Sequence, residues 1–249
     1  MAKIKLINKL PSKSTSRYEM AHKIELRRLN LEAKAILAGS PDLDAAMKRI
    51  NRIVEKSSIR KKLVQASDEI YNNAWLKVFE KKIPIVKPAT EKQQLVVKLW
   101  VDNNEKLHRE LMVRYAKEIK AITGKKIKEE ITKTEAVQKL RERNGVAQTF
   151  ARANAINETH TLNATVTKIR DLQIGAESAV WRTMEDDRVR GNPSGKYPDA
   201  EPSHFALNNR KFDPTVGILT IDTGEYIMPG EQWGCRCISE TTVEVQDAE

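Results

Sequence analysis

From about Arg17 to Leu172, apolar residues recur every three to four positions, over a span that favours a set of long helices. The longest run places its apolar side chains at Leu95, Leu99, Leu107, Leu111, Tyr115 and Ile119. Gly124 is expected to end that helix, and Asn144–Gly145 to separate a short helix from a last long one. Pro84 and Pro88 exclude a helix between them, because each removes an amide donor and restrains the preceding residue.

After Gly175 the sequence favours short strands and turns. Residues 178–184 suit a strand, residues 218–227 a hairpin with its turn at 222–224, and residues 235–245 a final strand. The sequence therefore predicts an α+β protein: a mainly α-helical N-terminal region of long helices, followed by a small α+β C-terminal domain with a short antiparallel sheet. The expected divisions are a flexible basic arm (1–16), a basic α-helical region (17–145) and the α+β domain (146–249).

Charge divides along the same line. Residues 1–150 carry 34 Lys and Arg against 18 Asp and Glu, whereas residues 151–249 carry 10 against 16. A cationic front favours a polyanion such as DNA nearby, because lysines and arginines at phosphates release counterions; the alternative is a solvated helix surface. The candidate DNA contacts are Arg60, Lys61, Lys62, Lys81, Lys82, Lys125, Lys126 and Lys128. No apolar run is long enough for a transmembrane helix, so no membrane partner is expected.

The chain has two cysteines, Cys235 and Cys237. Two cysteines cannot build a disulfide framework, which predicts synthesis in a reducing cytoplasm. We favour two buried thiols on one face of a strand, with Arg236 pointing away. The alternatives are a redox role or a zinc site, in which His204 and Asp187 would add ligands to the two cysteines.

Acidic and imidazole groups gather in the C-terminal part, at residues 185–187, His204 and Glu231. Such groups serve hydrolases as bases or metal ligands. The sequence lacks a His-Glu-x-x-His motif, a nucleophile elbow and a phosphate loop, so we expect no enzyme. The alternative is a metal-dependent hydrolase or nuclease that uses Asp187, His204 and Cys235/Cys237. The other histidines, at positions 22, 108 and 160, are expected at the surface or in the core.

One ordered series of residues runs from about Phe150 to Ile238. It comprises the helical residues 152–159, then Trp181, Asp186 or Asp187, Arg188, Arg190, His204, Asn209, Phe212, Pro229-Gly230-Glu231 and Cys235-Arg236-Cys237. This order resembles the phage Mu F-like minor head protein domain, also called the phage head morphogenesis family. Two features depart from the family pattern: the loop 191–202 separates Arg190 from His204, and Asn209 stands where glycine is common, which a left-handed backbone tolerates.

The resemblance implies a minor capsid protein of a tailed bacteriophage, associated with the portal inside the head, and acting in head assembly, DNA packaging or ejection. Its implied partners are the portal protein, the major capsid protein and packaged double-stranded DNA. It would be made in the host bacterial cytoplasm and reside in the virion, and it needs no cofactor. On this interpretation a buried polar network holds the C-terminal loops together, formed by Asp187, Arg188, Arg190, His204 and Glu231. A general nucleic-acid-binding protein is a further alternative.

Overall fold

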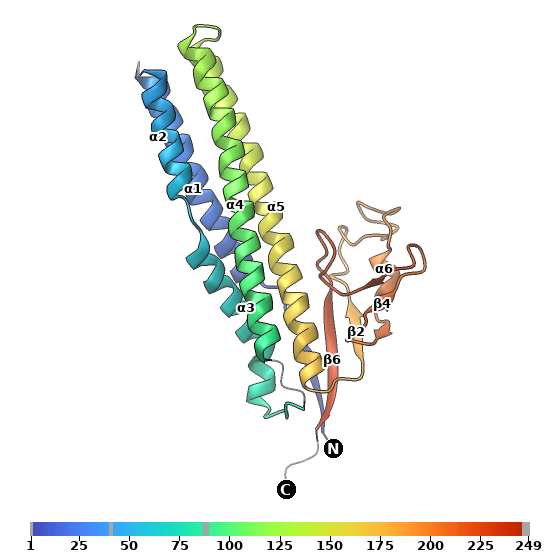
Figure 1. The fold of residues 1–249 in the computed structure, drawn as a ribbon. Coiled ribbons are helices and arrows are strands. Elements are labelled where there is room, and N and C mark those ends of the chain that lie inside the picture. Colours follow the sequence, from blue (N-terminus) through green and yellow to red (C-terminus); the bar gives the residue numbers. More distant parts are fainter. Residues whose placement is uncertain (1, 40–41, 87–89, 246–249) are drawn as a thin grey trace. The chain divides into compact units, whose positions relative to one another are not determined.

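The computed structural model describes residues 2–39, 42–86 and 90–245, and it confirms the predicted α+β class (Figure 1). The chain divides into two compact units. We call the first, Met1–Ser14, Ser67–Lys98 and Asn157–Glu249, the sheet unit, and the second, Thr15–Ala66 and Leu99–Ile156, the helical unit. The expected boundary at 145/146 does not separate these units, because α1, α3, α4 and α5 each contribute residues to both.

Five long helices carry most of the chain: α1 (Ser12–Ala38), α2 (Leu43–Lys56), α3 (Arg60–Glu80), α4 (Thr90–Ile127) and α5 (Lys133–Gln173). Residues 83–86 after α3 are non-helical, as Pro84 predicts, while Pro88 lies outside the described residues.

Two expected helix ends were wrong. Helix α4 continues three residues past Gly124, and α5 runs unbroken through Asn144–Gly145. A lone glycine costs a helix about 1 kcal/mol, which tertiary packing readily offsets. Helix α5 begins instead at a capping box, in which the Glu135 amide donates to Thr132 Oγ1 (3.2 Å) and the Thr132 amide donates to Glu135 Oε2 (2.7 Å).

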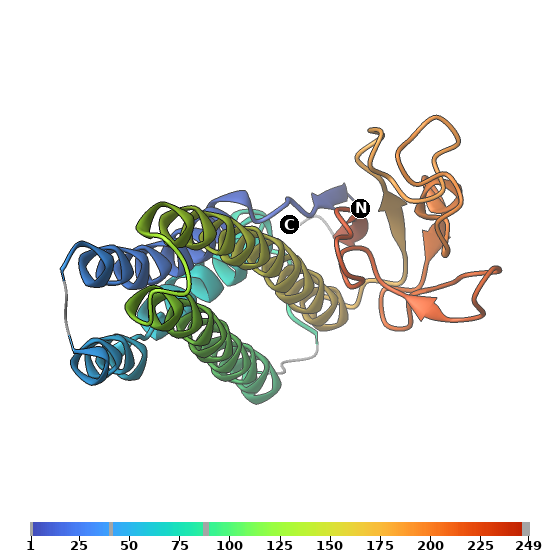
Figure 2. The same cartoon turned by 90° about the horizontal axis from the view of Figure 1, so that it is seen from above.

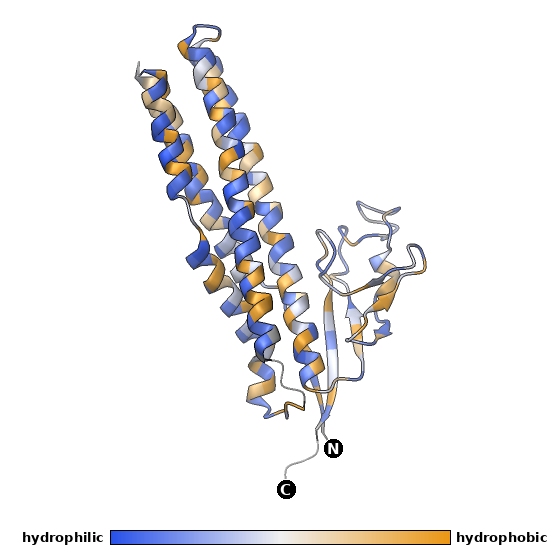
Figure 3. Cartoon of the chain, in the orientation of Figure 1, coloured by the Kyte–Doolittle hydropathy of each residue, from blue (hydrophilic) through white to orange (hydrophobic). Residues whose placement is uncertain are grey.

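The helical unit has one apolar core between α1, α2, α4 and α5, which run side by side (Figure 2). Hydrophobic and hydrophilic residues are interspersed along each helix (Figure 3), and apolar residues from all four helices are buried in this core. Leu29 of α1, Ile50 of α2, Met112 of α4 and Ala151 of α5 are all fully buried there.

A buried polar layer also crosses the helical unit. His22 Nδ1 lies 2.9 Å from His108 Nδ1, and His108 Nε2 lies 2.7 Å from Ser57 Oγ. Beside them the Tyr18 hydroxyl donates to Asn104 Oδ1 (2.6 Å) and accepts from Asn154 Nδ2 (3.1 Å). His22 and His108, which were expected at the surface or in the core, are thus core residues.

The sheet unit contains a four-stranded antiparallel sheet in the order β1-β6-β2-β3. Its strands are β1 (Ala2–Ile7), β6 (Ile238–Val245), β2 (Ala179–Arg182) and β3 (Lys211–Phe212). Residues 2–7 pair along their length with residues 240–245, which corrects the expectation of a flexible arm. The alternation Ile4-Lys5-Leu6 buries Leu6 and exposes Lys5, so this basic segment meets the requirements of an edge strand.

The C-terminal end of α5 is fixed to this sheet by buried polar contacts. Arg170 pairs with Asp171 at 2.6 Å, and both side chains are at most 3% exposed. Asp171 Oδ2 accepts from Thr241 Oγ1 of β6 (2.8 Å), and Arg170 Nη1 donates to the Ala74 carbonyl of α3 (3.2 Å).

Residues 179–237, from β2 to the start of β6, form a small module with little regular structure. It holds the two-residue strands β4 (Ile218–Leu219) and β5 (Tyr226–Ile227), paired as the predicted hairpin, and the one-turn helix α6 (His204–Leu207). Its core is built from nine buried residues: Ala179, Trp181, Leu207, Phe212, Ile218, Ile227, Met228, Cys235 and Cys237.

Candidate functional site

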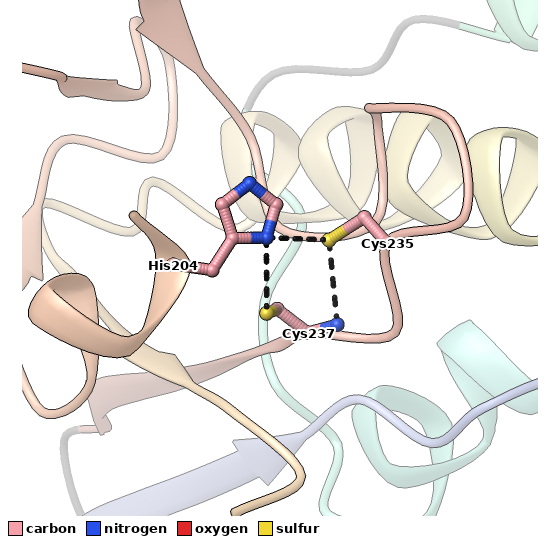
Figure 4. Close-up of side chains that lie close together, drawn as sticks. All are labelled: His204, Cys235 and Cys237. Carbon is pink, nitrogen blue, oxygen red and sulfur yellow. Dashed lines mark hydrogen bonds between the residues drawn. The ribbon is translucent and has the colours of Figure 1, made fainter. Parts of the chain in front are cut away.

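The candidate site is the cluster of His204, Cys235 and Cys237 in the core of this module (Figure 4). His204 is the first residue of α6, whose start is capped by Ser203 through a hydrogen bond from the Ala206 amide (3.3 Å). The two cysteines lie in the loop before β6, which corrects the expectation that they share a face of a strand. Glycines at 230 and 234, both with positive φ, make the turns of this loop.

The three side chains converge through their metal-binding atoms. His204 Nδ1 lies 3.5 Å from Cys235 Sγ and 3.6 Å from Cys237 Sγ, and all three residues are buried. Both cysteines are free thiols. Such a group can bind a soft or borderline metal, close a disulfide, or hold a thiolate beside an imidazole.

The opposite side of the imidazole ring is anchored by an amide. Gln232 Oε1 lies 2.8 Å from His204 Nε2 and also accepts from Arg190 Nη1 (3.2 Å). Because an amide oxygen only accepts, His204 carries its proton on Nε2 and turns the Nδ1 lone pair toward the sulfurs. Edge-on packing of Trp181 against the ring, with centroids 5.4 Å apart, fixes its plane.

Backbone amides favour a thiolate at Cys235. Its Sγ accepts from the amides of Gly230 (3.2 Å) and Cys237 (3.4 Å). A hydrogen bond from the Cys237 thiol, followed by contacts with His204, holds the pKa of Cys235 well below its usual value although burial opposes this. The same hydrogen bond and burial raise the pKa of Cys237. The pair of thiols therefore loses its first proton readily and holds its second proton firmly.

The cysteine loop is attached to its surroundings at three points. His160 Nδ1 of α5 lies 2.9 Å from the Cys235 carbonyl, and the Gly234 amide donates to Asn157 Oδ1 (3.2 Å). Arg236, between the two cysteines, pairs with Asp186 at 2.5 Å. That hydrogen bond lowers the pKa of Asp186 to about 2.

The predicted polar network is only partly assembled. His204 and Arg190 meet through Gln232, a residue that the sequence analysis did not single out and that no motif marks. The other three members of the predicted network contact different residues. Asp187 pairs with Lys196 (3.2 Å), Arg188 with Asp186 (3.5 Å), and Glu231 Oε2 accepts from the Met228 amide (3.0 Å).

The burial predicted for that network also fails for these three residues, because all of them are exposed. Among the described residues, the group that could hold a metal consists of His204, Cys235 and Cys237 and does not include Asp187. The geometry thus separates Asp187 from the residues with which the hydrolase alternative combines it.

The candidate DNA contacts fall into three separate places. Residues 60–62 begin α3, Lys81 and Lys82 follow its end about 30 Å further along the axis, and the lysines at 125, 126 and 128 close α4 and the turn after it. Arg60 pairs with Asp102 at 2.7 Å. Lys81 and Lys82 belong to the sheet unit, whereas the other candidates belong to the helical unit.

A continuous basic surface lies instead on the middle of α4, where the sequence analysis did not place one. Lys106, Arg109, Arg114 and Lys117 are exposed and line one shallow depression, with Glu110 as its acidic member. Lys106 with Arg109, and Arg114 with Lys117, are each three residues apart, which was a usable signal because side chains at that spacing are neighbours on a helix.

Within the described residues, none of the helices is long and apolar enough to cross a membrane. Comparisons with protein-family models, curated proteins and solved structures found no match to this chain.

Proposed function

We propose that the chain is a minor head protein of a tailed bacteriophage, a structural component without turnover that acts inside the head at the portal. One observation carries this proposal: residues of the head-morphogenesis pattern that are far apart in sequence meet in one buried cluster. Trp181 packs edge-on against His204 and against Phe212, with centroids 5.4 and 6.3 Å apart, and His204 contacts both cysteines.

Asn209 adds a second point of agreement with the pattern. It adopts a φ of 65°, the left-handed conformation that favours glycine, which is common at this position of the pattern. Its side chain accepts a hydrogen bond from Arg182 of β2. Both features support the proposal, because residues of the ordered series lie together in one module.

Within that role, the sheet unit is the part that contacts the portal, and the major capsid protein is a further contact. The helical unit lies near packaged DNA. The basic depression on α4 supports this division, because four cations face one acid there. Cations on one helix face bind phosphates without reading sequence.

The proposal is tested by co-expressing the chain with the portal and major capsid proteins encoded beside it in its own genome. Purified immature and mature particles are then examined by mass spectrometry and cryo-electron microscopy. We expect a few copies per particle, inside the head at the portal vertex. Absence of the chain from both kinds of particle refutes the proposal.

The DNA contact is tested separately with a short duplex of arbitrary sequence. Changing both Lys106→Ala and Lys117→Ala should reduce the slope of log affinity against log salt by about 2, since each phosphate contact contributes roughly 0.9. The matched control changes Lys3→Ala and Lys211→Ala, exposed lysines of the sheet unit. Equal slopes for the α4 variant and the wild type would show that DNA does not bind at this surface.

A further inference from the structure

We propose that His204 Nδ1, Cys235 Sγ and Cys237 Sγ bind one zinc ion that ties α6 to the cysteine loop. Zinc bonds of about 2.3 Å to sulfur and about 2.0 Å to nitrogen, at a tetrahedral angle, place a thiolate and an imidazole nitrogen about 3.5 Å apart. The two sulfur-to-nitrogen distances here are 3.5 and 3.6 Å. His204 Nδ1 therefore already has the separation from each sulfur that a tetrahedral ion requires, and all three donor atoms lie within 4.8 Å of one another.

The surrounding hydrogen bonds prepare each ligand for a metal. Gln232 accepts from His204 Nε2 and so leaves Nδ1 as the ligand atom, the arrangement usual for metal-binding histidines. The amides of Gly230 and Cys237 donate to Cys235 Sγ, which stabilises a thiolate. Two thiolates neutralise the charge of one zinc ion, so a buried complex carries no net charge.

The fourth coordination position of the proposed zinc ion is not taken by a protein side chain of the described residues. A cavity of about 20 Å³ adjoins the three ligands, lined also by Met184, Val189 and the side chains of three arginines. That volume holds one water molecule. Among the described residues no fourth His, Cys, Asp or Glu belongs to the group, so the expected coordination is Cys₂His with water.

The donor set favours zinc over magnesium and calcium. Thiolate and imidazole suit zinc, while magnesium and calcium require oxygen ligands. The small module also has a reason to need it, because its core holds only nine buried residues and its strands β3, β4 and β5 have two residues each. A metal supplies folding free energy where so little apolar surface is buried.

The experiment uses the full chain, purified under reducing conditions from zinc-supplemented cells, with zinc measured by inductively coupled plasma mass spectrometry. We expect one zinc per chain, released by a strong chelator with a lowered melting temperature and restored by added zinc. Cobalt(II) should give the intense visible bands of a tetrahedral site and a thiolate charge-transfer band. This cobalt spectrum is measured on the unaltered chain, so the test does not depend on whether a variant folds.

Variants assign the ligands. Cys237→Ser and His204→Asn should each bind zinc at least tenfold more weakly, and Gln232→Ala about tenfold more weakly through loss of the imidazole anchor. Phe212→Leu is the matched control, because it perturbs the same core without removing a ligand and should retain one zinc.

Three outcomes would overturn the assignment: a metal-free chain whose melting temperature ignores zinc and chelator, a cobalt spectrum without thiolate bands, or a disulfide between the two cysteines in freshly reduced protein. The zinc site does not rest on the proposed phage role. Failure to find the chain in particles leaves it intact, and loss of the zinc site leaves the particle experiment unaffected.

Discussion

The buried histidine pair of the helical unit makes that unit sensitive to acid. Burial, reinforced by the neighbouring His108, lowers the pKa of His22 to about 3. Burial lowers the pKa of His108 to about 4, against the opposing charges of Glu105 and Glu25. In the unfolded chain both imidazoles titrate near pH 6.5. Between these values the unfolded state binds more protons, so stability is full above about pH 7 and falls as the pH decreases.

The size of this effect follows from the two shifts. On going from pH 7 to pH 5, each histidine protonates almost fully in the unfolded chain and hardly at all in the folded one. Each therefore costs about 2 kcal/mol, and the pair about 4 kcal/mol if the two titrate independently. The geometry agrees with neutral rings, because a second proton between two Nδ1 atoms 2.9 Å apart would place like charges in contact.

Hydrogen exchange measured by mass spectrometry on peptides from residues 15–38 of α1 and 99–127 of α4 reports on the helical unit, because both ranges belong to it. After correction for the intrinsic pH dependence of amide exchange, the opening free energy should fall by about 4 kcal/mol between pH 7 and pH 5. A His22→Gln/His108→Gln variant should lose most of that dependence, whereas His160→Gln, in the sheet unit, should keep it. Constant protection in the wild type, or an equal fall in the double variant, would refute the reasoning.

Three further perturbations test the packing. Asp171→Ala should lower the free energy of unfolding by about 3 kcal/mol in urea denaturation, because it strands the buried charge of Arg170; a loss below about 1 kcal/mol would contradict this. Thr132→Ala should cost about 1 kcal/mol by removing the cap of α5, and Thr132→Ser should restore it. Gly217→Ala should cost about 2 kcal/mol, since φ is +109° there and a Cβ would lie 2.6 Å from the Ile227 carbonyl; an unchanged melting temperature would show that the turn relaxes.

Much of the fold could be predicted because helical periodicity is a local signal. The non-helical residues after α3 and the β4–β5 hairpin both follow from residues a few positions apart. The strand β1 could not be predicted in this way. Its partner strand is residues 240–245, at the far end of the chain. A basic segment with alternating apolar residues resembles a solvated arm until that partner is known.

The candidate site shows the same limit. Cys235 and Cys237 were recognisable from their spacing, and the pattern that included His204 brought all three into one hypothesis. The grouping of Asp187 with them failed, because its carboxylate is at the surface beside Lys196. Residue types identify which side chains could bind a metal or react. Which of these side chains lie close together depends on the conformations of the loops, and loops have no periodic sequence pattern from which they could be predicted.

The pairing of β1 with β6 also sets an order for folding during synthesis. All residues of the helical unit have been made once the ribosome passes Ile156, but β1 has no partner until residues 240–245 appear. At an elongation rate of roughly 5–20 residues per second that interval is on the order of 10 s. During it the strand has an unpaired edge, and its alternating lysines disfavour the pairing of that edge with another chain.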